Sequence, residues 1–280
     1  MKNVLRIALG MLLTQPAWAQ KPDLHAIEQN ILQEGLALYR SERASWVATD
    51  LLMARKPDLA DVVGYLSYAE GDSLRTVFFQ QASDTAPLLA RYIFSFPQGA
   101  IEPRAGRQLK TRPASATEQK LFTVRRHVMG ELTAHKVAGA PYDFPENTHP
   151  NVAILEQGNT IRAYVLTGPQ QGGVLPIGND ILMQIGRDLQ VRSVERLHTS
   201  YLPMKLPEGQ QVTTGMHSHL PAHPYITATD ICSLLLFQDA FPVPRHLVVG
   251  REYVSIFDAS TQSVVILTKK AYEKMGRDKK

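Results

Sequence analysis

The sequence has a single cysteine, Cys232, among its 280 residues. No intrachain disulfide can therefore form, and no cysteine stands behind the N-terminal segment to take a lipid anchor. Stability must come from packing instead. With 44% hydrophobic residues, a chain of this length has enough material for one large core or for two smaller ones.

An apolar run long enough to cross a bilayer, about 20 residues, is also missing. The chain opens MKNVLRIALGMLLTQPAWAQ, where Lys2 and Arg6 flank or interrupt a short apolar run and Ala17-Trp18-Ala19 forms a small-x-small cleavage site. This pattern is typical of a secretory signal peptide over residues 1–19, and the alternative is an N-terminal core helix. We therefore expect an exported protein, periplasmic or secreted, without a stable membrane anchor.

The chain also has little net charge. Once Lys2 and Arg6 leave with the signal peptide, 28 basic residues stand against 26 acidic ones. A nucleic-acid-binding protein would show a clustered basic face. The sequence has none, so we do not expect a nucleic-acid partner.

Hydrophobic periodicity predicts an α+β fold. Apolar residues at helical spacing after Lys21 indicate a first helix, and VVGYLSYA, SLRTVFFQQ and LLARYIFSF indicate an antiparallel meander. Residues 97–115 are rich in Pro and Gly and are interpreted as a connection. We expect residues 20–138 to form a helix-and-meander region of unknown role, and residues 139–280 to form a mixed sheet with a central helix, ATDICSLLLFQDA.

The most distinctive stretch is GMHSHLPAHPYITATDI, residues 215–231. If its first part is a strand, His217 and His219 point to the same face about 6.6 Å apart and can converge on one ion. A catalytic zinc takes three protein ligands and keeps a fourth position for water. Asp230 is the candidate third ligand, because a helix that begins near Thr227 would carry it back toward the strand end.

This spacing resembles the JAMM signature of the JAB/MPN metalloprotease family, in which HSH is followed by seven residues, a serine, two residues and an aspartate. Here His217, His219, Thr227 and Asp230 occupy those positions, and the resemblance covers residues 150–270. It implies that the two histidines and the aspartate hold Zn²⁺. It also implies a JAB/MPN-like sheet and a zinc-dependent hydrolase that cleaves a peptide or isopeptide bond in a peptide or protein substrate, with cell-wall peptides among the options.

The resemblance also implies two catalytic roles. Thr227 stands in place of the usual serine, keeps a hydroxyl and would stabilise the oxyanion. An upstream glutamate would act as general acid and base, and Glu156 in LEQGNTIRAYVL fits that position best. Since a general base is identified by geometry, three competitors stay open: Glu42, Glu131 and Glu195.

Other interpretations remain beside this one. Thr227 to Asp230 also matches a capping box, which needs no metal and is compatible with a ligand role for Asp230. HSHLPAH matches a surface copper or zinc cluster in which His223, and not Asp230, is a ligand. A JAB/MPN-like fold that retains a metal can also serve as a non-catalytic binding module.

Three further residues are interpreted as structural. His198 and His246 stand at strand edges and can line the same face, but a lone strand histidine is more often a satisfied core residue. Cys232 follows the helix start within an apolar run, which predicts a buried thiol.

Overall fold

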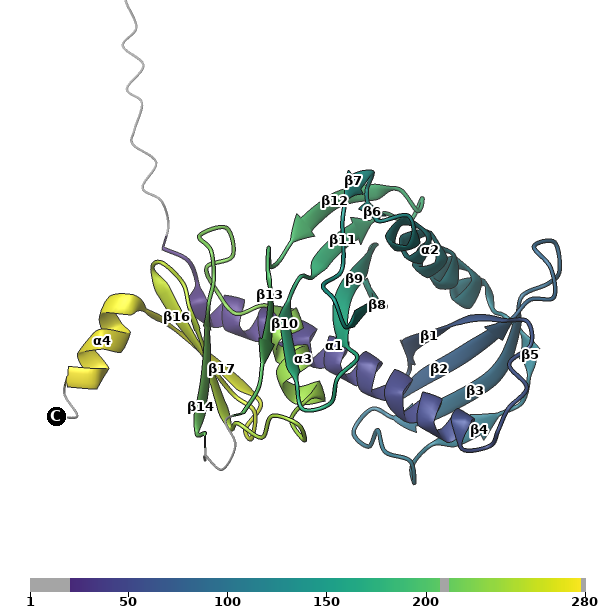
Figure 1. The fold of residues 1–280 in the computed structure, drawn as a ribbon, viewed down its shortest axis with the longest axis horizontal. Coiled ribbons are helices and arrows are strands. Elements are labelled where there is room, and N and C mark those ends of the chain that lie inside the picture. The colour runs from purple at the N-terminus through teal and green to yellow at the C-terminus, as the bar shows by residue number, and fades with distance from the viewer. Residues whose placement is uncertain (1–20, 207–211, 278–280) are drawn as a thin grey trace, which may run out of the picture.

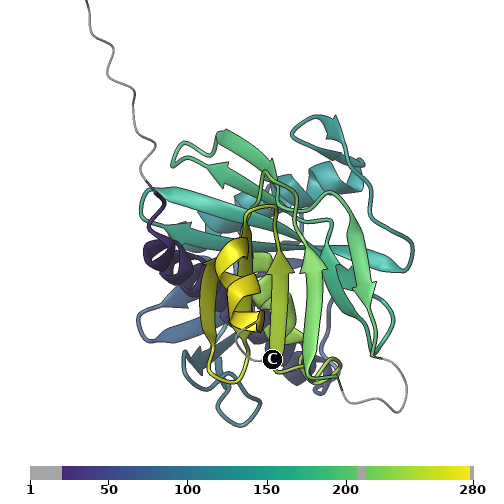
Figure 2. The same cartoon turned by 90° about the vertical axis from the view of Figure 1, so that its left-hand side faces the viewer.

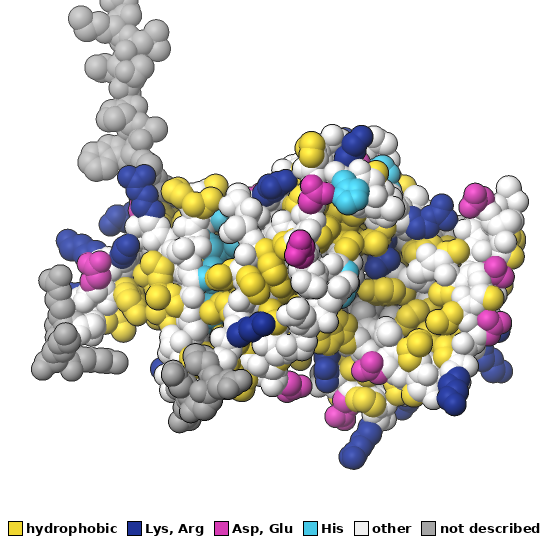
Figure 3. Space-filling model, in the orientation of Figure 1, with side chains coloured by type: hydrophobic (Ala, Val, Ile, Leu, Met, Phe, Trp, Pro, Cys, Tyr) yellow, Lys and Arg dark blue, Asp and Glu magenta, His cyan; other side chains and the backbone are white. Residues whose placement is uncertain are grey.

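A computed structural model describes residues 21–206 and 212–277. The predicted signal peptide at residues 1–19 lies outside them. Within the described residues, no helix is long and apolar enough to cross a membrane. Acidic and basic side chains are interspersed over the face shown in Figure 3, without a broad area of one sign.

The first predicted helix is present as α1, Leu24–Met53, which runs along most of the molecule (Figure 1). Its N-cap, Asp23, accepts a hydrogen bond from the backbone N–H of Ala26 at 3.1 Å. At Gly35 the helix approaches α3, Ala228–Leu236, so closely that a Cβ there would lie 2.7 Å from Cβ of Ile231. Glycine at this position therefore lets α1 support the helix that carries Asp230.

The predicted meander is also present. The strands β1, Val62–Glu70, β2, Ser73–Gln80, and β3, Leu89–Pro97, pair in antiparallel order. The interpretation of residues 97–115 as a plain connection is corrected, because β4, Arg107–Leu109, and β5, Arg112–Pro113, both pair with β3. Strands of two or three residues are too short to leave a periodic pattern.

The next helix, α2, Ala116–Thr133, begins with a capping box made by Ser115 and Glu118. Two short strands follow it, β6, Lys136–Val137, and β7, Ala140–Pro141. A four-stranded sheet then has the order β12-β11-β9-β8. Its strands are β8, Thr148–Gln157, β9, Thr160–Pro169, β11, Ile181–Ile185, and β12, Val191–Arg196. A separate pair is formed by β10, Leu175–Gly178, and β13, Tyr201–Met204.

One hydrophobic cluster joins the meander, α2 and the four-stranded sheet. It includes Leu66 of β1, Phe122 of α2 and Val165 of β9, all almost fully buried. The cluster therefore has members on both sides of the predicted boundary between residues 138 and 139.

The last sheet is mixed, as expected. Its strands are β14, Thr214–Ser218, β15, Arg245–Val249, β16, Tyr253–Asp258, and β17, Ser263–Thr268. Only β14 and β15 pair in parallel. The helix α3 packs against this sheet, and α4, Lys269–Arg277, follows its last strand (Figure 2). The α+β class is thus confirmed, and the sheet and α3 together position the histidine-rich stretch.

Candidate metal centre

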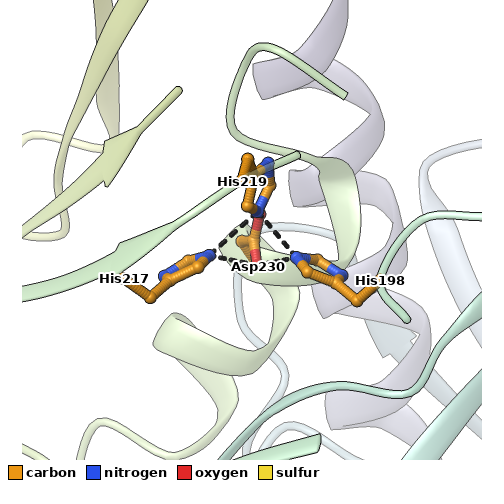
Figure 4. A group of neighbouring side chains, drawn as sticks. All are labelled: His198, His217, His219 and Asp230. Carbon is orange, nitrogen blue, oxygen red and sulfur yellow. Dashed lines mark hydrogen bonds and ion pairs between the residues drawn. The ribbon is translucent and has the colours of Figure 1, made fainter. Parts of the chain in front are cut away.

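Four side chains from three segments meet at the C-terminal end of β14 (Figure 4). His217 lies in β14 and His219 directly after it, Asp230 is in the first turn of α3, and His198 comes from the connection between β12 and β13. Their possible ligand atoms lie within 4.8 Å of one another. His217 and His219 therefore share a face and meet Asp230, but the group has a fourth member, His198, that was interpreted as structural.

Three of the distances between the possible ligand atoms match those in a tetrahedral zinc site. Oδ1 of Asp230 lies 3.3 Å from Nε2 of His198 and 3.4 Å from Nε2 of His217, and its Oδ2 lies 3.4 Å from Nε2 of His219. Ligands about 2.0–2.1 Å from a tetrahedral zinc are about 3.3 Å apart. The Nε2 atom of His219 is closer to those of His198 and His217, at 2.7 and 2.9 Å. All four side chains are at most 10% exposed.

The outer nitrogens of two rings fix how these rings face the centre. Nδ1 of His219 lies 2.8 Å from the carbonyl oxygen of Tyr225 and 3.1 Å from that of His223, and Nδ1 of His198 lies 2.6 Å from Oδ1 of Asp180. Carbonyls and carboxylates only accept, so both Nδ1 atoms carry the proton. In the neutral rings the Nε2 lone pairs then face each other, which is favourable only with a cation or a proton between them.

The third ring is held by another histidine. Nδ1 of His217 lies 2.8 Å from Nε2 of His246, which is fully buried in β15. Burial first, and then the charge of His217, lower the pKa of His246 to about 4. Neutral His246 can accept a hydrogen bond from Nδ1–H of His217 through its Nε2, and the Nε2 lone pair of His217 then faces the centre. Gly215 provides the space, because a Cβ there would lie 2.5 Å from Nδ1 of His246.

Asp230 contributes the negative charge. Its Oδ2 accepts hydrogen bonds from the backbone N–H and the hydroxyl of Thr227, each at 2.8 Å, whereas its buried Oδ1 accepts none. Burial alone would raise the pKa of Asp230, but the imidazoles of His198 and His217 hold it well below its usual value. A buried carboxylate oxygen without a donor is costly, and a cation removes that cost.

Without a cation, the proton in this group is held by His198. Burial would lower the pKa of His198, but Asp230 and Asp180 raise it to about 11. The pKa of His219 is lowered, first by burial and then by the neighbouring histidines. Because a ligand imidazole must be neutral, a metal that enters displaces a proton. Three imidazoles and one carboxylate oxygen without a hydrogen-bond partner therefore form a ligand set that can hold a metal ion.

Thr227 is the N-cap of α3, and its capping box with Asp230 is present as predicted. Its Oγ1 also lies 2.9 Å from that of Thr229. Because the Thr227 hydroxyl donates to Asp230, its proton orients the carboxylate in this arrangement.

The structure does not bring the glutamates into the group. Glu156 is the second-last residue of β8, where its Oε1 lies 2.5 Å from Nζ of Lys120 and its side chain is 41% exposed. Glu195 lies 3.6 Å from the ring of His223, Glu131 accepts a hydrogen bond from the backbone N–H of Ala138, and Glu42 is buried in α1. The His223 ring is outside the cluster, although its carbonyl contacts His219.

Comparison of the chain with family models, with curated proteins and with solved structures finds no match. The likeness to the JAMM signature therefore remains a prediction that rests on the spacing of four residues.

Proposed function

We propose that this protein binds one Zn²⁺ through His198, His217, His219 and Asp230. The observation that carries the proposal is the convergence of three inward Nε2 atoms on the Asp230 carboxylate, whose buried Oδ1 has no hydrogen-bond partner among the described residues. Imidazole and carboxylate ligands in a tetrahedral arrangement suit zinc. The outer contacts of the rings, with a carboxylate, backbone carbonyls and a second histidine, are those that orient metal-binding histidines.

Four protein ligands favour a structural role for this ion. Structural zinc sites are closed by four side chains, whereas catalytic ones keep a position open. The ion would tie the connection between β12 and β13 to the end of β14 and to the first turn of α3. We therefore infer an exported, metal-stabilised binding module as the function that the geometry supports best.

A second candidate is a JAMM-type hydrolase that cleaves a peptide or isopeptide bond. It is favoured by the sequence spacing of His217, His219, Thr227 and Asp230. Bound zinc would supply Lewis-acid activation of water and carbonyl. In this candidate His198 must leave the fourth position, and Thr227 must release Asp230 before it can donate to an oxyanion.

Elemental analysis together with a peptide and isopeptide library separates the candidates. The binding module predicts about one zinc per chain, loss of most zinc in His198→Ala, no hydrolysis in either protein, and full zinc content in the matched control His223→Ala. Zinc retained in His198→Ala together with hydrolysis that this variant gains would support the hydrolase. A chain purified without zinc, and unable to take it up, would overturn both.

A further inference from the structure

A second candidate site lies between α3 and the elements that pack against it. It is a cavity of about 270 Å³ that contains none of the four clustered metal ligands. The cavity is lined by residues of α1, β8, β9, and α3 with the turn after it, among them Glu42, Trp46, Asn151, Leu166, Cys232 and Phe237. Its volume is slightly below the usual range of small-molecule sites, about 300–1,000 Å³, so the cavity suits a small ligand.

The acidic side chain that lines this cavity is Glu42, which is only 2% exposed. The other polar lining residues are His149, Asn151, Thr167 and Ser233. Oε2 of Glu42 accepts a hydrogen bond from the side-chain amide of Asn151. The carbonyl oxygen of that amide accepts one from the Tyr65 hydroxyl at 2.9 Å, so the orientation of the amide is set. The other carboxylate oxygen, Oε1, accepts no hydrogen bond from the described residues, and it is not among the unpaired atoms that are fully inaccessible to solvent.

The charge of Glu42 is only partly compensated. Burial raises its pKa to about 7, a larger effect than the opposing ones of Arg125 and Asn151. Arg125 is engaged elsewhere, since its guanidinium stacks on the Tyr65 ring at 4.2 Å and its Nε donates to the Val152 carbonyl at 3.1 Å. A buried carboxylate is stable when a cation pairs with it. The cavity has room for a cationic ligand beside Glu42.

The walls suit an organic cation better than a hydrated ion. Trp46 and Phe237 meet edge to face with ring centroids 5.2 Å apart, and Leu166 and Leu236 add apolar surface. Trp46 is 38% exposed, so the cavity opens to solvent beside an indole ring. Aromatic faces attract ammonium and guanidinium groups, and apolar walls accept a carbon stem.

We propose that this cavity binds a small primary amine on a short apolar stem, with the ammonium group on Oε1 of Glu42 and the stem against Trp46 and Phe237. The site is independent of the proposed zinc centre, although α3 contributes residues to both. Ligands of the same size that are neutral or anionic lack the ion pair, and an anionic one is repelled by the carboxylate.

Tryptophan fluorescence tests the proposal directly. The chain has two tryptophans, and Trp18 lies in the predicted signal peptide, so protein with Trp18→Phe, or protein without residues 1–19, reports on Trp46 alone. At pH 8 we expect n-butylamine to change the emission in a saturable way, with an affinity at least about tenfold higher than that of 1-butanol or butyrate, as one desolvated ion pair would give. Glu42→Gln should lower the butylamine affinity at least about tenfold, whereas Glu156→Gln, which removes an exposed carboxylate elsewhere, should leave it unchanged.

A second variant keeps the test decisive if Glu42→Gln does not fold. Ser233→Leu on α3 fills part of the cavity and leaves the carboxylate in place, so it should also weaken butylamine binding. Zinc content measured on the same samples reports on the metal centre separately. Equal affinity for butylamine and 1-butanol would overturn the proposal, as would butylamine binding that neither Glu42→Gln nor Ser233→Leu weakens.

Discussion

Two fully buried carboxylates, Asp230 and Glu42, have opposite protonation behaviour. The pKa of Asp230 is held well below its usual value although burial opposes this, whereas burial raises the pKa of Glu42 to about 7. The difference lies in the neighbours, because Asp230 faces three imidazoles and Glu42 faces one amide and a more remote guanidinium. Burial alone therefore does not decide whether a carboxylate is ionised, and the positive groups within reach do.

The largest effect is expected at Asp230. Asp230→Asn removes the only negatively charged ligand from the group, so zinc content should fall to near zero and stability by about 3–5 kcal/mol. Elemental analysis and thermal unfolding measure both. Glu42→Gln is the matched control, and it should keep its zinc. Equal zinc content in the two variants would remove the distinction between the carboxylates.

The next largest effect on zinc binding is expected from the hydrogen bond between His217 and His246. His246→Ala leaves Nδ1 of His217 without its partner, so zinc affinity should fall about 10–100-fold. A competition titration with a chromophoric chelator measures the change. Gly215→Ala, which pushes on the ring of His246, should lower the affinity in the same direction. Unchanged affinity in both variants would show that His246 does not position the ligand.

The pH dependence of stability distinguishes the Glu42 environment. Its folded pKa of about 7 lies above the ordinary value of 4.5, so the fold favours the protonated form. This contribution is fully present below about pH 4.5 and is lost as the pH rises through about 7. Wild type should therefore lose up to about 3 kcal/mol relative to Glu42→Gln over this interval, as denaturant titrations at several pH values would measure. If the stability of the two proteins changes with pH in parallel, the assigned pKa shift is contradicted. The other titratable groups around Glu42 are Tyr65 of β1, Arg125 of α2, His149 of β8 and Cys232 of α3.

The smallest effect is expected at an exposed carboxylate. Glu156→Gln breaks one ion pair with Lys120 at the surface, so the free energy of unfolding should change by less than about 1 kcal/mol, with zinc content unaffected. Denaturant unfolding provides the value. If hydrolysis is found in the wild type, its loss in this variant would place Glu156 in the reaction after all.

The sequence predicted the local parts of the site. Strand alternation placed His217 and His219 on one face, and the capping box placed Asp230 in the first turn of a helix, because both patterns depend on residues close in the chain. Cys232 is buried as expected. His198 could not be selected in this way, since its approach depends on how β12 and β13 pair with other strands. The neighbours of Glu156 depend on the same kind of long-range packing, of β8 against α2.

Zinc X-ray absorption spectroscopy on the purified full chain tests the central claim most directly. The four-ligand centre predicts four nitrogen or oxygen neighbours at about 2.0–2.1 Å, with outer-shell scattering from three imidazoles. Five or six light neighbours, or outer-shell scattering from only two imidazoles, would contradict it.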